Sequence, residues 1–129
     1  MALFKVVGFV RWQQKQQLSD AVLCAAVEEM RQGLIDADLG GGVVKKRIAR
    51  PGGGKRGGYR TLLATNKQDK WFFLYGFAKN ERDDLPPQDL RALKAFAREL
   101  LALDERKLRR AMASGDLQEI SYGQITFAH

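Results

Sequence analysis

The sequence predicts a single α+β domain, and three observations support this fold class. The chain has 129 residues, the length of one domain. Its composition of 45% hydrophobic and 29% charged residues is close to the globular average. Three consecutive β-prone segments occupy the middle of the chain, with helical periodicity before and after them. The predicted order β-α-α-β-β-β-α-α-β, with an antiparallel meander at its centre, indicates α+β.

The N-terminal part predicts a strand followed by helical segments. Residues 3–7 are apolar and β-prone, and residues 9–17 favour one or two helical turns. The stretch 34–42, which precedes the meander, is predicted to be a loop.

A longer helix is predicted between these segments. Ser19 and Asp20 indicate its start, because a hydroxyl accepts hydrogen bonds from free N–H groups and an acid suits the helix dipole. Gly33 is a natural end. The apolar residues between them recur at helical spacing and are Val22, Leu23, Ala26, Val27 and Met30.

Three strands are predicted in the middle of the chain, over residues 43–49, 59–65 and 70–78. In the first, Val44 and Ile48 fall on one face and Lys45 and Arg47 on the other. Residues 50–58 are too rich in glycine for a strand and predict a long hairpin tip. The last strand is apolar almost throughout, as expected of a strand buried on both faces.

The C-terminal part predicts two helices and a final short strand. Pro86 and Pro87 precede an apolar stripe at 3.6-residue spacing, formed by Leu90, Leu93, Phe96, Ala97, Leu100 and Leu101. Asp104 is a candidate cap for a helix over residues 105–113, and residues 116–120 read as a strand. We therefore expect a folded domain over residues 1–120 and a tail over residues 121–129.

The net charge of +7 is concentrated in one segment. Between Asp38 and Asp69 the chain has eight of its 22 lysines and arginines and no acidic residue. The remaining 14 basic residues face 15 acidic ones, so the rest of the chain is almost neutral. The same window holds eight of the 13 glycines. A concentrated basic segment of this kind favours a polyanionic partner such as a nucleic acid, over the alternative of a solvated hairpin.

Composition excludes several other kinds of site. The single cysteine, Cys24, lies on the apolar face of a predicted helix and is interpreted as a packing residue. The single histidine, His129, is the last residue, so metal clusters and histidine-based triads are not expected. The longest apolar run, residues 71–78, is far short of a membrane span. We expect a reduced, cytoplasmic setting with no membrane partner.

The glycines at 52–57 formally match G-x-G-x-x-G. A dinucleotide-binding loop opens a helix, however, whereas a strand is predicted to follow here. A glycine-rich hairpin lying against a nucleic-acid backbone is the better interpretation.

Several cations fall at strand positions that bring them together. Lys45 and Arg47 share a face of one strand, and Arg60 lies near the start of the next. Lys79 ends the third strand, with Arg82 just beyond it. Arginine clamps phosphate oxygens, and a lysine crowded by other cations exchanges protons more readily. Such a cluster suffices in principle for RNA cleavage by the 2′-hydroxyl, but spacing alone favours phosphate binding over catalysis.

Two stretches of the chain point to a known family. Residues 42–60 contain K-x-R followed by R-P-G-x-G-K-x-G-G-Y-R, and residues 77–82 read F-A-K-N-E-R. Together they closely resemble the RelE/HigB-type toxins of bacterial type II toxin–antitoxin systems, and the similarity extends over residues 4–120.

The resemblance implies a RelE-like, microbial-RNase-like fold, in which a central antiparallel sheet is flanked by N-terminal helices and a C-terminal helical segment. It implies an endoribonuclease, or mRNA interferase, that cuts mRNA on the ribosome without a metal or other cofactor and so inhibits translation. The expected partners are the ribosome, mRNA and a cognate antitoxin, which in HigB-like systems is often a helix-turn-helix protein.

By position, the resemblance assigns four catalytic residues. Lys45 and Arg47 match the strand positions that contact and activate the substrate. Arg60 matches the arginine that stabilises the transition-state phosphate, and Lys79 matches the basic position after the buried strand. The expected RNA-binding residues are the other nearby cations, Lys46, Arg50, Lys55, Arg56 and Arg82.

The chain departs from the RelE pattern after the third strand of the meander. It has Asn80 where the pattern has an arginine, and no tyrosine a few residues later. These residues therefore leave the general acid unassigned between Lys79 and Arg82.

Two other functions are compatible with the same residues. One is a non-catalytic RNA- or DNA-binding module that uses the basic glycine-rich hairpin. The other is an interaction protein whose hairpin docks an acidic partner segment. RNA cleavage distinguishes the toxin from both.

Overall fold

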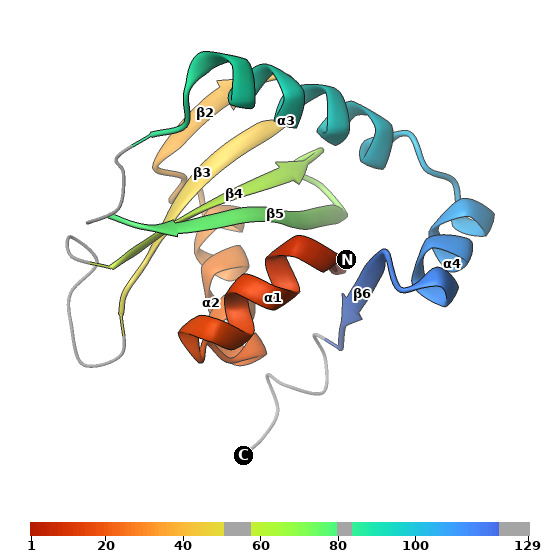
Figure 1. Cartoon of the computed structure of the whole chain (residues 1–129), viewed down its shortest axis with the longest axis horizontal. Helices are drawn as coiled ribbons and strands as arrows, with labels where there is room; N and C mark the ends of the chain where they lie inside the picture. The colour runs from red at the N-terminus through yellow and green to blue at the C-terminus, as the bar shows by residue number, and fades with distance from the viewer. Residues whose placement is uncertain (51–57, 80–83, 122–129) are drawn as a thin grey trace.

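A six-stranded mixed sheet forms the centre of the computed structural model, which describes residues 1–50, 58–79 and 84–121 (Figure 1). The strand order is β2-β3-β4-β5-β1-β6. The strands are β1 (Ala2–Val6), β2 (Ala37–Gly40), β3 (Val43–Ile48), β4 (Tyr59–Thr65), β5 (Lys70–Ala78) and β6 (Leu117–Ile120). With four helices around this sheet, the fold is α+β, as the sequence predicts.

The predicted antiparallel meander is formed by β3, β4 and β5. The N-terminal strand β1 pairs in parallel with β5, and β6 then pairs antiparallel with β1. The first and last strands of the domain thus extend the sheet beyond β5.

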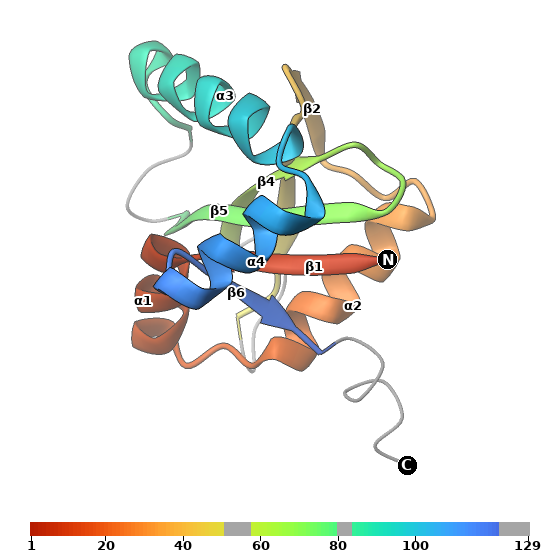
Figure 2. The same ribbon diagram turned by 90° about the vertical axis from the view of Figure 1, so that its right-hand side faces the viewer.

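Helices cover both faces of the sheet, as Figure 1 shows. Helices α1 (Val7–Gln16) and α2 (Asp20–Arg31) lie on one face, and α3 (Pro87–Leu101) crosses the other. Helix α4 (Glu105–Ser114) follows α3 and contacts β6 (Figure 2).

Aromatic side chains build the core beneath α1. Phe9 packs on Phe73 of β5 with ring centroids 5.0 Å apart. Trp12 lies over Gly76, where a Cβ atom would come within 2.4 Å of the indole ring. Glycine at this position therefore allows α1 to approach the sheet closely. On the α3 face, Phe4 stacks on Phe72 at 5.0 Å.

A buried polar network joins β1 to the two N-terminal helices. The Lys5 ammonium lies 2.8 Å from an Asp20 carboxylate oxygen and 3.0 Å from Gln13 Oε1. Burial raises the pKa of Asp20, but hydrogen bonds from Lys5 and Gln13 and the Lys5 charge outweigh it, so the pKa lies below its usual value.

The predicted helix ends are confirmed. Ser19 Oγ accepts from the Val22 N–H at the start of α2, and Asp104 accepts from the Lys107 N–H at the start of α4. Helix α3 begins at Pro87, whose missing N–H costs nothing at a first-turn position.

Two expectations about the sheet are wrong. The stretch 34–42 contains the edge strand β2, because its backbone pairs with β3 although its own residues have little β propensity. The strand β5 is not buried throughout, since Tyr75 on its α3 face is 37% exposed. Helix α3 therefore leaves part of β5 uncovered.

No helix among the described residues is long and apolar enough to cross a membrane.

Candidate nucleic-acid interface

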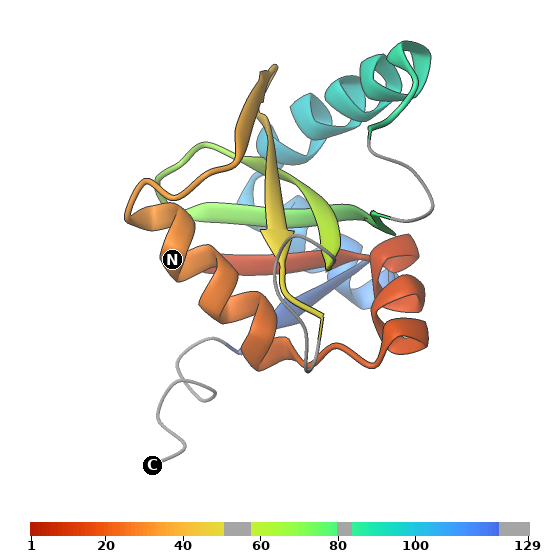
Figure 3. The ribbon, with the colours of Figure 1, turned by 90° about the vertical axis from the view of Figure 1, so that its left-hand side faces the viewer.

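Cations from β3 and β4, together with one that follows β5, lie at one end of the meander on the face that α3 crosses. Arg47 on β3 lies opposite Arg60 on β4, and Arg60 lies opposite Phe77 on β5. Residues paired across strands in this way share a face of the sheet. Lys45, two residues before Arg47, lies on that face as well. Figure 3 looks onto this end of the sheet.

Lys79 follows the end of β5 beside these residues. Its backbone N–H donates to the Gly58 carbonyl at 3.3 Å, so the β4–β5 pairing continues to this point. Gly58 lies so close to β3 that a Cβ atom would stand 2.2 Å from the Ile48 carbonyl oxygen. The glycine of the G-G-Y-R stretch therefore permits the tight pairing that brings Arg60 beside Arg47. We call Lys45, Arg47, Arg60 and Lys79 the cationic corner.

Among the described residues, Asp84 and Asp36 place carboxylates against the cationic corner. The Lys45 ammonium lies 2.9 Å from an Asp84 oxygen, and the lysine side chain is 18% exposed against 71% for the aspartate. Asp36 accepts a hydrogen bond from the Arg47 backbone N–H at 2.7 Å and places its other oxygen 3.9 Å from Arg47 Nε. Both acids come from segments outside the meander, so the sequence analysis did not identify them.

The two arginines of the cationic corner differ in exposure. The Arg47 side chain is 46% exposed, so its guanidinium can reach a ligand in solvent. Arg60 is 5% exposed, and it is held by interactions within the chain. Arg60 thus lies on the buried side of the cationic corner, and Arg47 lies on its solvent side.

Lys46 lies on the opposite face of β3, which removes it from the predicted RNA-binding set. Its side chain is 3% exposed, and its ammonium lies 2.7 Å from Glu29 of α2. It also donates to the Leu34 carbonyl at 2.9 Å. Because neighbouring residues of a strand point to opposite faces, Lys46 cannot join Lys45 and Arg47. Its contacts attach α2 to the sheet.

Arg50 lies beyond the end of β3 and stacks on an aromatic ring. Its guanidinium carbon is 5.2 Å from the centroid of Tyr59, which in turn packs edge-on against Trp12 of α1. Arg50 therefore stands beside the α1 face rather than within the cationic corner.

The remaining predicted residues Lys55, Arg56 and Arg82 lie outside the described part of the chain, as do most of the hairpin tip, Asn80 and residues 122–129. Within the described residues, no three His, Cys, Asp or Glu side chains come together in a way that could hold a metal ion. Cys24 is buried, and burial raises the pKa of its thiol, as expected of a packing residue.

The cationic corner has the chemistry of a phosphate site. Carboxylates already occupy positions beside Lys45 and Arg47, and a phosphate offers the same kind of oxygen acceptor. A ribose–phosphate backbone can therefore exchange with Asp84, the more exposed of the two acids.

Comparison with known proteins identifies the family of the chain. The family model described as "RelE toxin of RelE / RelB toxin-antitoxin system" matches residues 1–120, which include the ten helices and strands of the described residues and the whole cationic corner. No curated protein matches the chain. The match covers nearly the full length of the chain and confirms the resemblance. The chain belongs to the RelE toxin family and is the toxin of a toxin–antitoxin system.

Proposed function

We propose that this toxin is an endoribonuclease that cuts mRNA on the ribosome and thereby inhibits translation. The observation that supports the proposal is the cationic corner, in which Lys45, Arg47 and Arg60 share one face of the sheet. Arg47 and Arg60 are paired directly across β3 and β4, so both side chains leave the same face of the sheet, which supports the binding of one phosphate by both. The family is generally one of endoribonuclease toxins.

The proposed reaction is an attack of the RNA on itself. The 2′-hydroxyl loses its proton and forms a bond to the adjacent phosphorus, and the bond from phosphorus to the 5′ oxygen breaks. The products are a 2′,3′-cyclic phosphate and a 5′-hydroxyl. This reaction needs a proton acceptor, a proton donor and stabilisation of the extra negative charge on the phosphate.

The described residues can divide these tasks. Arg47 and Arg60 bind the phosphate oxygens, and their charge is worth most as negative charge develops there. We assign Lys45 to accept the proton of the 2′-hydroxyl. Lys79 supplies a proton to the departing 5′ oxygen. None of these steps calls for a metal ion.

Asp84 enters this scheme as the group that RNA displaces. Its carboxylate contacts Lys45 at 2.9 Å, and its own side chain is 71% exposed, so it separates from the lysine at small cost. Asp84→Asn removes a competing negative charge without changing shape, and we expect it to tighten RNA binding.

The test of this function is cleavage of mRNA by the purified chain with and without programmed ribosomes, followed by mapping of the new 5′ ends. Arg47→Ala and Lys79→Ala are expected to lower the cleavage rate by about 10²–10³-fold. Arg98→Ala, which removes an exposed cation from α3, is the matched control and should cleave normally. Intact mRNA with ribosomes present would overturn the proposal.

If RNA is bound but stays intact, the chain is a binding module instead. Its affinity would then fall steeply with added salt, because cations that neutralise phosphates release counterions.

A ribosome-directed toxin acts in the cytoplasm, and its antitoxin is proposed to be of the helix-turn-helix type.

A further inference from the structure

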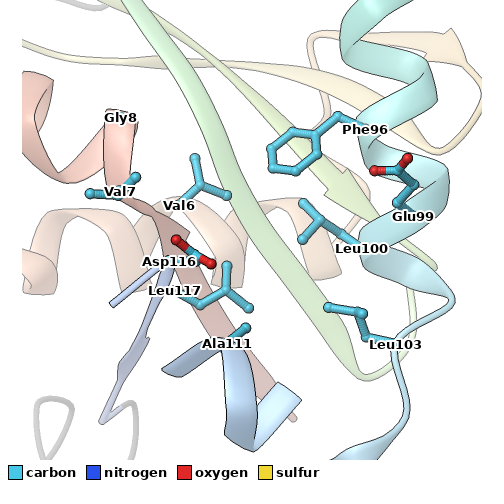
Figure 4. A pocket seen from close by; sticks show the side chains of 10 residues that line it. All are labelled: Val6, Val7, Gly8, Phe96, Glu99, Leu100, Leu103, Ala111, Asp116 and Leu117. Atoms are coloured by element: carbon cyan, nitrogen blue, oxygen red, sulfur yellow. The ribbon is translucent and has the colours of Figure 1, made fainter. Parts of the chain in front are cut away.

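A residue that influences the proposed reaction has to lie against the cationic corner. An apolar pocket of about 550 Å³ between α3 and the start of α1 does not meet this condition (Figure 4). None of the residues that line it belongs to the cationic corner, and its ionisable lining residues, Glu99 and Asp116, are acids that repel an RNA backbone. The direct contacts of the four cations are therefore the ones that bear on cleavage.

Asp36 lies just before β2 and continues the pairing of β2 with β3. Its backbone N–H donates to the Lys45 carbonyl at 3.1 Å, as a strand residue does. Its carboxylate accepts from the Arg47 backbone N–H at 2.7 Å. A side-chain oxygen thus takes the place of a strand carbonyl at this point. Asp36 therefore fixes the backbone of β3 at both Lys45 and Arg47.

The same carboxylate also lies beside the Arg47 side chain. Its second oxygen is 3.9 Å from Arg47 Nε. Because one carboxylate holds both the backbone and the side chain of Arg47, it restricts the directions that the guanidinium can take. A contact at Nε leaves the two terminal amino groups of the guanidinium to bind a phosphate.

Asp36 is held more firmly than Asp84. The Asp36 side chain is 29% exposed and contacts a backbone N–H as well as a cation. The Asp84 side chain is 71% exposed and contacts Lys45. When RNA displaces Asp84, the anchored carboxylate of Asp36 therefore stays beside Arg47.

We propose that Asp36 is a positioning residue for RNA cleavage, which holds the Arg47 guanidinium in the direction that the transition-state phosphate requires. The inference rests on the proposed nuclease function, in which Arg47 binds the phosphate. A 46% exposed arginine loses rotational freedom when it binds a ligand, and a fixed partner removes part of that cost before RNA arrives. Asp36 acts through Arg47 and needs no contact with RNA itself.

Asp36→Asn tests the charge and keeps the backbone contact, because an amide oxygen still accepts from the Arg47 N–H. On programmed ribosomes we expect kcat to fall by about 10- to 100-fold, as for a misplacement of up to about 1 Å. KM should stay equal or fall, because the substitution removes a negative charge beside the RNA. A residue that bound RNA directly would instead raise KM when replaced.

Asp38→Asn is the matched control on the same strand. Asp38 has the same kinds of partner as Asp36, since it accepts from the Gly40 N–H at 3.0 Å and forms an ion pair with Lys67. Neither partner belongs to the cationic corner, so kcat and KM should match those of the unmodified chain.

A double-mutant cycle with Arg47→Ala distinguishes positioning from support of the fold. If Asp36 acts through Arg47, Asp36→Asn should change kcat by less than about twofold once Arg47 is absent. A purely structural role would lower the activity by the same factor with and without Arg47. Melting temperatures show whether each variant is folded. If Asp36→Asn does not fold, Asp36→Ser replaces it, because a hydroxyl also accepts a hydrogen bond and has no charge.

The outcomes distinguish the inference from the nuclease function. Unchanged kcat in the folded Asp36 variant, a raised KM with unchanged kcat, or an equal loss in the Arg47→Ala background would overturn the role of Asp36. The nuclease function would still stand in each of these cases, because the unmodified chain cleaves. Intact mRNA after incubation with the unmodified chain and ribosomes would overturn both.

Discussion

Replacing Lys46 by methionine tests whether the face of β3 that carries Lys46 stabilises the fold and leaves RNA cleavage to the opposite face. Methionine keeps the length and the apolar stem of the lysine but removes the ammonium. That ammonium lies 2.7 Å from Glu29 and 2.9 Å from the Leu34 carbonyl, and the side chain is 3% exposed. The substitution therefore removes contacts that join α2 to the sheet and leaves the cationic corner untouched.

The expected loss of stability follows from these contacts. A hydrogen bond to a charged group is worth about 1.5–3 kcal/mol. Glu29 is 37% exposed, so water can solvate its carboxylate once Lys46 is gone, and this reduces the penalty. We expect Lys46→Met to lower the free energy of unfolding by about 1–3 kcal/mol. The melting temperature should fall by roughly 3–5 °C for each kcal/mol.

Arg47→Met is the matched variant on the other face. The Arg47 side chain is 46% exposed, so its removal should cost less than about 1 kcal/mol of stability. The assays are urea denaturation and mRNA cleavage at a temperature where both variants are folded. Lys46→Met should be less stable with normal cleavage, and Arg47→Met stable with cleavage lowered by about 10²–10³-fold. A stable Lys46→Met variant that fails to cleave would show that Lys46 contacts RNA and would refute the assignment of faces.

Two further predictions concern the fold. Gly76→Ala should lower the free energy of unfolding by about 1–3 kcal/mol in thermal denaturation, because its Cβ would stand 2.4 Å from the Trp12 ring. Gly8→Ala, with no atom within 4 Å of the added carbon, is the control and should cost nothing. Burial raises the pKa of Asp20, but the hydrogen bond and charge of Lys5 contribute to a net lowering. The network therefore stabilises the fold above the unfolded pKa of about 4, and this contribution is lost as pH falls through the lower folded value. Urea titrations from pH 3 to 6 should show a weaker pH dependence for Asp20→Asn, and an identical dependence would contradict this reasoning.

The main elements of the fold follow from local sequence signals. The predicted strands over residues 59–65 and 70–78 coincide with β4 and β5, because β propensity and turn residues both act over a few positions. The helix starts at Ser19 and Asp104 were predicted for the same reason, since a capping side chain contacts a backbone N–H only three residues away.

Alternation along β3 also predicted that Lys45 and Arg47 share a face, as the pairing confirms. The same alternation places Lys46 on the other face, yet its charge alone put it with the RNA-binding residues. Composition describes how many cations a segment has, whereas side-chain direction determines which of them can meet a ligand.

The sequence by itself thus determined the fold class, most of the element boundaries and the concentration of positive charge in the meander. Only the tertiary structure decided which acidic residues lie beside these cations. Asp36 and Asp84 reach Arg47 and Lys45 from 11 and 39 residues away. The edge strand β2 exists because β3 lies beside it, and Tyr75 is exposed because α3 leaves β5 partly uncovered. Propensity and periodicity act between residues that are close in sequence. The burial of a side chain and the pairing of distant strands depend on how distant segments pack, and no single stretch of the chain contains that information.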